Sequence, residues 1–396
     1  MPFCFHKCHY CDFYSIVDTQ DRMEAFTDAL VADIERSSAW ARNEGPGLNH
    51  APAPLDSIFV GGGTPTLLPV EYWRRVLDAL HASLDLSRMT GPTGPGEFTV
   101  ECNPETATPD LMQTLASGGV NRLSIGAQSF DETHLKTLER WHDPKNVGRA
   151  VSLARDAGIE RISVDLIYAI PGQSVEQALS DIDRALELGT EHISAYSLTY
   201  EPGTAMTARM QRGEFPPTDE ETDAVMFVAI ADRLASHGFR RYETSNFALP
   251  GAECRHNLAY WRQRDWIAVG PSASAHIAGH RWKNAPRLGT YLSSLSSGSP
   301  PPVVDFETPD PRRALSERIM TGLRLSDGLD ASAILASARR IDASLPAEVR
   351  ASVRSLREQG LLKPRGVRRL ERWILTGEGE LLADRIAADL MAVVDP

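Results

Sequence analysis

The stretch RISVDLIYAIPGQSVEQALSDIDRALELGTEHISAYSL (residues 161–198) decides the fold. It opens with a run rich in β-branched residues over 161–168, which is typical of a strand. Apolar residues three and four apart then predict a helix over 175–189 that ends at a glycine. A second strand-like run follows at 192–198. Strand, helix and strand in this order predict a right-handed βαβ unit in a parallel sheet.

The same unit recurs along the chain. Further strand-like runs are SIFV (57–60), FTVE (98–101), RLSIG (122–126) and WIAVG (266–270), with helical patterns at 71–84, 146–158 and 219–238. Five or six such units predict an α/β fold built as a partial (β/α)6 barrel. A doubly wound open sheet is the alternative, and periodicity does not separate the two.

A change of pattern predicts a second domain. The Ser- and Pro-rich stretch YLSSLSSGSPPPVVD (291–305) interrupts the alternation and has the composition of a linker. Beyond it, helical patterns at 311–322 and 346–359, a short hairpin and a closing helix predict a small winged-helix-like domain. We therefore predict a barrel domain over 1–290, a linker over 291–305 and a C-terminal domain over 306–396.

Composition excludes several classes of protein. The 396 residues are 42% hydrophobic and 24% charged, and no apolar run is long enough to span a membrane. No secretory signal is recognisable, so we expect a cytoplasmic protein. A formal net charge of -12 argues against a nucleic-acid partner, because neutralising phosphates requires a basic surface. Five cysteines are too few for a disulfide framework.

Three of those cysteines, Cys4, Cys8 and Cys11, crowd into the segment CFHKCHYC. Thiolates are soft ligands that bind zinc or iron–sulfur clusters. A zinc site needs a fourth ligand, and His6 and His9 lie too close within the segment to fold back easily. In a [4Fe–4S] cluster the three thiolates would hold three irons and leave one open for a chelating small molecule. We favour the cluster.

This segment, with Asp12 and Phe13 after it, resembles the signature of radical S-adenosylmethionine (SAM) proteins, in which SAM occupies the open iron. Within that superfamily the chain resembles the oxygen-independent coproporphyrinogen III oxidase family, and specifically its haem-chaperone branch, over almost its whole length. The resemblance implies a radical SAM barrel, a [4Fe–4S] cluster held by Cys4, Cys8 and Cys11, and SAM as a second cofactor.

A glycine-rich motif, FVGGGTPT (59–66), follows the first predicted strand. By itself it predicts a turn, and Pro65 makes a helix directly after it, as in a dinucleotide site, unfavourable. Beside the cysteines, we favour a second interpretation, in which the missing side chains let backbone amides approach the amino group of SAM. The family resemblance implies that Gly62, Gly63 and Thr64 line the SAM site.

Polar residues also mark the ends of successive predicted strands, where working residues gather in parallel βα folds. Glu101 ends one strand, Gln128 follows the next, and Asp165 interrupts the apolar run RISVDLIY. Each alone could be a buried polar group with its partners satisfied, but three together predict one polar pocket. The resemblance assigns Glu101, Gln128, Asp165 and also Arg140 to the ribose, carboxylate and amino groups of SAM, with Ser197 near the adenine.

The stretch RHNLAYW (255–261) distinguishes the branches of the family. It could be an ordinary packing segment, because aromatic residues usually pack in cores. Its H-N-x-x-Y-W pattern resembles the haem-chaperone branch, which implies haem binding with His256 as an axial ligand. Cys254 is a second possible ligand, although a buried inert thiol fits it better. Phe13 stands where the oxidases carry a further cysteine, which also favours haem carriage.

The resemblance therefore implies a haem chaperone that binds haem and delivers it to an apo-haemoprotein, with a respiratory client and an electron donor for the cluster as expected partners. Peripheral membrane contact stays an open question. Two alternatives remain: an oxygen-independent coproporphyrinogen III oxidase, and a zinc-binding, DNA-associated regulator. Relatives carry a strand ahead of the residues matching Pro2, Phe3 and Cys4, so we expect translation to begin upstream of Met1.

Overall fold

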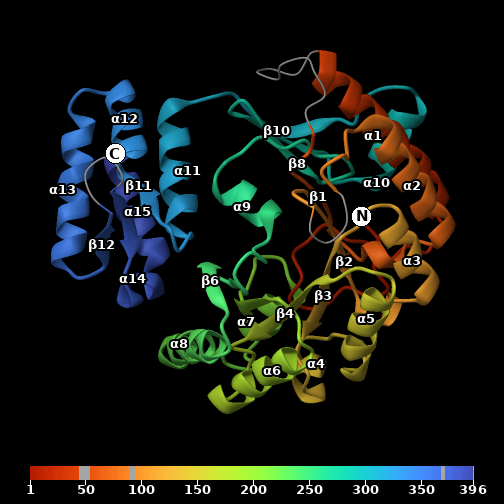
Figure 1. Ribbon diagram of the computed structural model, residues 1–396, viewed down its shortest axis with the longest axis horizontal. Coiled ribbons are helices and arrows are strands. Elements are labelled where there is room, and N and C mark those ends of the chain that lie inside the picture. The colour runs from red at the N-terminus through yellow and green to blue at the C-terminus, as the bar shows by residue number, and fades with distance from the viewer. Residues whose placement is uncertain (44–53, 90–93, 367–370, 396) are drawn as a thin grey trace.

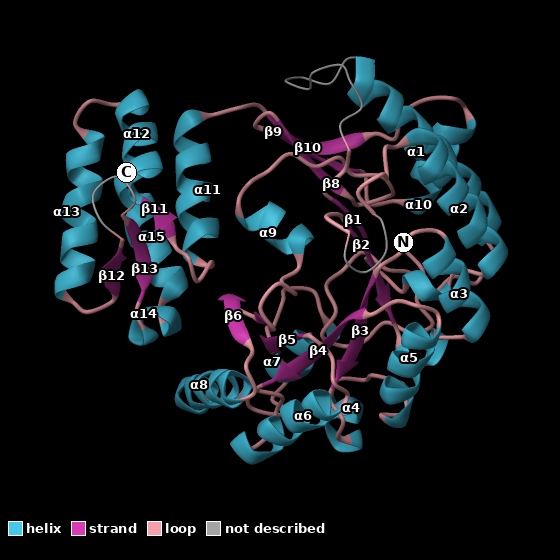
Figure 2. Cartoon of the chain, viewed as in Figure 1, coloured by secondary structure: helices cyan, strands magenta, loops and turns pink. Residues whose placement is uncertain are grey.

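The larger part of the chain forms a curled sheet with helices on its outer side (Figures 1 and 2). The computed structural model describes residues 1–43, 54–89, 94–366 and 371–395. The sheet has the strand order β1-β2-β3-β4-β5-β7-β6, and β1 to β5 are parallel. Its strands are β1 (Ser57–Val60), β2 (Glu97–Cys102), β3 (Arg122–Gln128), β4 (Arg161–Tyr168), β5 (His192–Ser197), β6 (Arg240–Glu243) and β7 (Asn246–Ala248).

Helices connect the parallel strands and cover the outside of the sheet (Figure 1). Several begin where the sequence supplies a capping side chain: the Ser174 hydroxyl accepts a hydrogen bond from the Gln177 backbone amide and forms a capping box. The helices of this domain are α1 (Met23–Asn43), α2 (Val70–Ser83), α3 (Pro109–Ser117), α4 (Glu132–Thr137), α5 (Lys145–Asp156), α6 (Val175–Glu187), α7 (Ala205–Gln211), α8 (Glu220–Ser236), α9 (Arg255–Trp261) and α10 (Leu288–Ser296), with 3-10 turns at Pro65–Leu67 and Pro104–Thr106.

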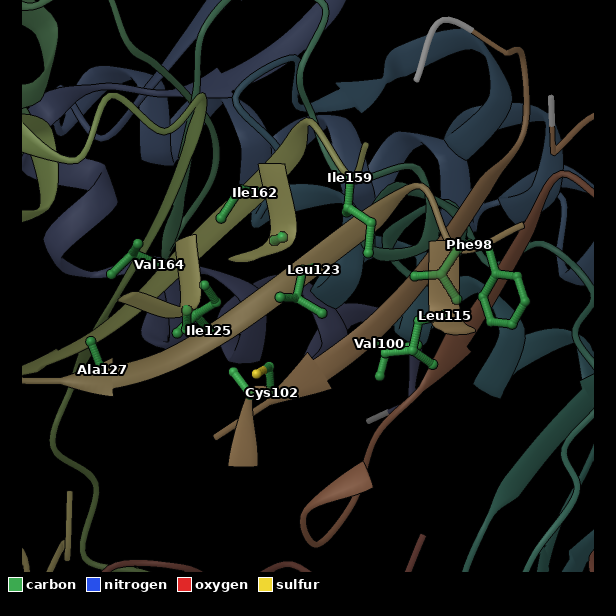
Figure 3. Packing of buried hydrophobic residues seen from close by; sticks show 14 of the residues in the cluster. Phe98, Val100, Cys102, Leu115, Leu123, Ile125, Ala127, Ile159, Ile162 and Val164 are labelled. Carbon is green, nitrogen blue, oxygen red and sulfur yellow. The ribbon is translucent and has the colours of Figure 1, made fainter. Parts of the chain in front are cut away.

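The two faces of the sheet differ in polarity because side chains alternate along each strand. On the outer face, apolar residues of β2, β3 and β4 pack on the helices; Figure 3 shows Val100 beside Leu115 of α3, with Ile125 and Val164 further along the same cluster. The inner face carries polar residues arranged in rows by the register of the strands. Ser57 lies opposite Glu97, Glu101 opposite Ser124, and Asp165 between Gly126 and Ser194.

The sheet confirms the predicted partial barrel and differs from the prediction in one strand. Residues 266–270 do not join the sheet: Trp266 makes only an isolated bridge to His276. The place after β5 is taken by a hairpin of β6 and β7, in which Glu243 pairs with Asn246 across a tight turn. Such a short connection enforces antiparallel pairing, because a parallel crossover needs a dozen residues or more.

A second, antiparallel sheet packs beside α1 and consists of β8 (Ser274–Ile277), β9 (His280–Asn284) and β10 (Val303–Glu307) in the order β10-β9-β8. The predicted linker over 291–305 overlaps this region. Its first residues belong to α10, whose Tyr291 and Leu295 are buried in the barrel core, and its last residues pair as β10 with β9. Burial of these apolar side chains orders a stretch whose composition indicates a linker.

The C-terminal residues form a domain with its own hydrophobic core, drawn in blue in Figure 1. It is winged-helix-like, as predicted, with a small sheet in the order β11-β13-β12. Residues 367–370, between β12 and β13, lie outside the described residues. The elements are α11 (Pro311–Leu323), β11 (Leu329–Asp330), α12 (Ala331–Ile341), α13 (Leu345–Glu358), β12 (Leu362–Arg365), β13 (Arg372–Leu375), α14 (Gly377–Leu381) and α15 (Ala383–Val394). Within the described residues, no helix has the length and apolar character needed to cross a membrane.

Candidate functional site

The segment that carries the three cysteines lies against the carboxyl end of β1. The backbone amides of Gly63 and Thr64 donate to the carbonyl oxygens of Met1 (2.6 Å) and Phe3 (2.7 Å). A Cβ atom at Gly62 would lie 2.8 Å from the Met1 oxygen, and one at Gly63 would lie 2.6 Å from the Phe3 oxygen. The glycines therefore make room for the N-terminal segment, and their amides are not left open as the sequence suggested.

Cys4, Cys8 and Cys11 are free and half-buried. The Cys4 sulfur lies 3.4 Å from the Thr64 hydroxyl, and Arg140 Nη1 lies 3.9 Å from the Cys8 sulfur. Within the described residues, no three His, Cys, Asp or Glu side chains already converge as a set of metal ligands. The thiols share one segment, and their soft donor atoms and spacing fit a [4Fe–4S] cluster.

The neighbouring histidines are engaged elsewhere. The His6 ring stacks on Trp141, with 4.1 Å between centroids, and Nδ1 of His9 lies 3.1 Å from Nη1 of Arg209. Stacking holds the His6 ring against Trp141, and Arg209 occupies Nδ1 of His9, so neither ring is oriented by the thiols as a zinc ligand would be. The arrangement favours a cluster held by three thiolates over zinc.

Four of the predicted polar residues meet near the carboxyl ends of β2, β3 and β4. Glu101 accepts a hydrogen bond from the Gly62 amide at 3.0 Å, and burial together with the nearby Asp165 raises the pKa of Glu101 to about 7. Arg140 Nη2 donates to the Gly126 carbonyl at 2.8 Å. A Cβ atom at Gly126 would lie only 2.9 Å from the Gln128 amide nitrogen, so this glycine lets Gln128 and Arg140 approach the strand.

Asp165 is held by serine hydroxyls from three strands. Ser124 donates to one carboxylate oxygen at 2.8 Å, while Ser163 and Ser194 donate to the other at 3.2 and 2.7 Å. These three neutral donors hold the carboxylate in place. Asp165 thus presents an immobilised negative charge on the inner face of the sheet.

Ser197 ends β5, but its hydroxyl points away from this group. It donates to both carboxylate oxygens of Asp223 on α8, at 3.0 and 2.9 Å. The side chain therefore ties the strand to the outer helix. Only its backbone is available for the adenine contact that the family resemblance implies.

At the amino ends of the same strands, sequence reasoning missed an important residue, Glu97. Its side chain is fully buried and accepts hydrogen bonds from the backbone amides of Arg255 (3.0 Å) and His256 (3.1 Å) at the start of α9. Arg161 Nη1 lies 3.4 Å from its carboxylate. A signal was present in the sequence, because side chains of a strand alternate between its two faces. Phe98, Val100 and Cys102 are apolar and share the outer face, so Glu97 lies on the inner face together with Glu101.

His256 lies in an aromatic environment at this end of the sheet. Its Nδ1 is 3.0 Å from the Ser57 hydroxyl, and its ring centroid lies 5.0 Å from Phe59 and 4.6 Å from Tyr260. Burial, opposed in part by Glu97, lowers the pKa of His256 to about 4. The imidazole is therefore neutral at physiological pH, the form that ligates metals.

Cys254 is fully buried, and its thiol donates to Glu97 at 3.2 Å. Burial raises the pKa of this thiol to about 12. The sulfur is thus a protonated structural group, in agreement with the inert role predicted for it.

The structure separates the cysteine segment from His256. His256 contacts the row formed by Ser57 and Glu97, whereas Glu101 lies four residues further along β2, roughly 13 Å at the rise of a β-strand. α9 lies between the sheet and α11 of the C-terminal domain (Figure 2). The thiol segment and the His256 imidazole therefore lie at opposite ends of one sheet.

Comparison with known proteins identifies the class. The family model of the radical SAM superfamily matches residues 1–185, and that of the HemN C-terminal domain matches residues 310–379. The solved structure of coproporphyrinogen III oxidase (HemN) from Escherichia coli superposes with a TM-score of 0.80, covering 98% of this chain and 88% of its own, at 21% identity. The fold and the cysteine segment thus define a radical SAM protein.

Relatives in sequence narrow the class to a family. The heme chaperone HemW of Mycobacterium tuberculosis H37Rv is 34% identical over 99% of this chain and 93% of its own length. The heme chaperone HemW of Lactococcus lactis is 34% identical over 83% of this chain and 81% of its own, and that of Bacillus subtilis is 32% identical over 91% of each. The chain belongs to the HemW heme chaperone family of radical SAM proteins.

Proposed function

We propose that the protein binds a [4Fe–4S] cluster and SAM at the carboxyl ends of its strands, binds haem beside α9, and delivers that haem to an apo-haemoprotein. The observation that carries the proposal is the pairing of a three-thiol segment with a separate neutral imidazole among aromatic rings. Membership of the HemW family supports haem as the cargo.

In the first site, Cys4, Cys8 and Cys11 would hold the cluster, which supplies an open iron corner and redox capacity when bound. Arg140, beside Cys8, offsets part of the negative charge of the thiolates. The remaining residues assigned to SAM lie at neighbouring strand ends, where the carboxyl groups of Glu101 and Asp165 are acceptors for an ammonium group and the Gln128 amide is a donor for a carboxylate. The full set is Gly62, Gly63, Thr64, Glu101, Gln128, Asp165 and the backbone of Ser197.

In the second site, His256 would ligate the haem iron. Its Nδ1 is engaged by Ser57, so Nε2 is the ring nitrogen without a hydrogen-bond partner among the described residues. Tyr260, 40% exposed, lies between the His256 ring and Trp266, whose centroid is 4.4 Å from that of Tyr260. This run of rings offers an apolar, planar surface for a macrocycle next to its ligand.

Haem carriage is favoured over porphyrinogen decarboxylation by Phe13. This side chain is 57% exposed beside the cysteine segment and cannot supply the thiol that the oxidases carry there. We place the activity in the cytoplasm, whose reducing conditions suit five free thiols. A respiratory apo-haemoprotein as client and an electron donor for the cluster complete the proposal.

The test is haem binding by anaerobically reconstituted protein, followed by absorbance in the Soret region. His256→Ala is expected to weaken haem affinity on the order of 10-fold or more, with loss of the imidazole-ligated spectrum. His237→Ala, an exposed histidine at the end of α8, is the matched control and should bind like the parent. Unchanged haem binding by His256→Ala would remove the proposed ligand.

A second experiment separates the carrier from the enzyme. The reconstituted protein is incubated anaerobically with coproporphyrinogen III, SAM and a reductant, and the products are resolved by chromatography. The carrier is expected to leave the substrate intact and, in a separate incubation, to transfer bound haem to an apo-haemoprotein. Accumulation of protoporphyrinogen IX would overturn the carrier and favour the oxidase.

A further inference from the structure

The short helix α9 is fixed at its first turn by a single carboxylate. Glu97 accepts hydrogen bonds from the amides of Arg255 and His256 and from the thiol of Cys254, at 3.0, 3.1 and 3.2 Å. We infer that Glu97 and Ser57 are positioning residues for the proposed haem ligand: Glu97 sets the backbone of His256, and Ser57 sets its ring. This inference rests on the haem site proposed above.

The helix needs such an anchor because it is too short to be stable alone. Helices of fewer than about 12 residues are marginal in water, and α9 spans Arg255–Trp261. Its first amides have no partners within the helix, so the carboxylate of Glu97 both satisfies two of them and defines where the helix begins. The position of His256 is therefore set by the sheet through Glu97.

Glu97 can act as a fixed point because its own position is determined by charge and burial. It is fully buried, and its carboxylate pairs with Arg161 at 3.4 Å. The buried Arg122, in the same row of the sheet as Arg161, adds a second positive charge nearby. A charged group in a low-dielectric interior keeps the geometry that satisfies all its partners.

Ser57 completes the arrangement from the neighbouring strand. Ser57 lies opposite Glu97 in the register of β1 and β2, and its hydroxyl oxygen lies 3.0 Å from His256 Nδ1. A histidine that ligates a metal commonly donates a hydrogen bond from its other ring N–H to such a partner, and this bond fixes the tautomer and the ring orientation. The rings of Phe59 and Tyr260 pack against the imidazole and restrict its rotation. Glu97, Ser57 and the two rings leave Nε2 as the nitrogen for iron.

The test compares two carboxylates that share Arg161. Glu97→Gln keeps the shape of the side chain but removes the negative charge of the carboxylate that accepts the hydrogen bonds from the α9 amides. Glu191→Gln is the matched control, because Glu191 Oε1 lies 3.3 Å from the same arginine and has no hydrogen bond to α9 among the described residues. Ser57→Ala removes the partner of the imidazole and leaves the Glu97 contacts in place. Circular dichroism verifies that each full-length, reconstituted variant is folded.

Two readouts are measured with haem as the probe: its dissociation constant and the iron–imidazole stretching frequency of the ferrous complex in resonance Raman spectra. We expect Glu97→Gln to weaken haem affinity on the order of 10-fold and to broaden the iron–imidazole band, since loss of an outer partner of a metal ligand has effects of this size. Ser57→Ala is expected to shift the band to lower frequency, because the imidazole becomes less basic. Glu191→Gln should change neither readout.

The outcomes are distinct. If the parent shows an iron–imidazole band that His256→Ala abolishes, and Glu97→Gln and Ser57→Ala leave both readouts unchanged, the inference is overturned while the proposed ligand stands. If His256→Ala retains the band, both the ligand and the inference fall. Should Glu97→Gln not fold, an unchanged band in Ser57→Ala is sufficient to reject the positioning of the ring.

Discussion

Removing the positive partner of Glu97 tests how the amino end of the barrel is held together. Arg161 contacts two carboxylates of different burial: Glu97, fully buried, and Glu191, 33% exposed on its side chain. Arg161→Met leaves Glu97 buried with less compensation. Breaking a buried ion pair from one side costs about 3–5 kcal/mol. Because Arg122 and two backbone amides still support Glu97, we expect a loss near the lower limit, about 3 kcal/mol.

The loss of stability in Arg161→Met should depend on pH, and its direction follows from the pKa of Glu97. In the parent, burial alone would raise the pKa of Glu97, but Arg122, Arg161 and the α9 amides together lower it. A carboxyl with a lowered pKa stabilises the fold above its unfolded-state pKa, and that contribution is lost as the pH falls through the folded-state pKa. Without Arg161 the Glu97 pKa rises, so the destabilisation is expected to be largest near pH 7 and to shrink toward pH 4.

The assay is urea unfolding of the apo-protein followed by circular dichroism at several pH values, with the slope checked for constancy between variants. Glu191→Gln serves as the comparison, since an ion pair whose carboxylate reaches solvent contributes about 0–1 kcal/mol. A cost below about 1 kcal/mol for Arg161→Met at pH 7, or a cost that does not change with pH, would refute the reasoning from burial.

Three further predictions concern other parts of the molecule. Burial raises the pKa of Glu101 to about 7, so the parent should lose stability as the pH rises from about 4.5 through 7. The Tm of Glu101→Gln relative to the parent should therefore increase from pH 5 to pH 8. A Tm difference that stays constant over this range contradicts the prediction. In the apo-protein a thiol reagent should modify the three half-buried N-terminal cysteines while the protein is folded, Cys11 more slowly because burial raises its pKa, whereas Cys102 and Cys254, buried and with pKa values raised to about 12, react only on unfolding. Gly328→Ala should destabilise the C-terminal domain by about 1–3 kcal/mol, measured by hydrogen exchange, because its φ is +64° and a Cβ atom would lie 2.2 Å from a backbone oxygen of β13. Gly360→Ala, with φ +76° and no such contact, should cost less.

The architecture of the parallel strands follows from local patterns. The β-branched runs and the 3.6-residue periodicity between them predict β1 to β5 and the helices that join them, because each element must bury one apolar face. The cysteine segment and the polar residues at strand ends were likewise readable, since the carboxyl ends of parallel strands meet at one edge of a sheet. Asp165 lies close enough to Glu101 to raise its pKa, and Arg140 contacts the Gly126 carbonyl on the neighbouring strand.

The sequence by itself determined the family, because motifs of residue type and spacing carry the resemblance, and through that resemblance it predicted the barrel and a cluster at the thiol segment. Only the tertiary structure decided that β6 and β7 close the sheet as a hairpin, that α9 is anchored by Glu97, and that His256 lies at the far end from the cysteines. The physical reason is that these contacts join residues far apart in sequence. Burial and register between strands set them, and neither is encoded in any short window.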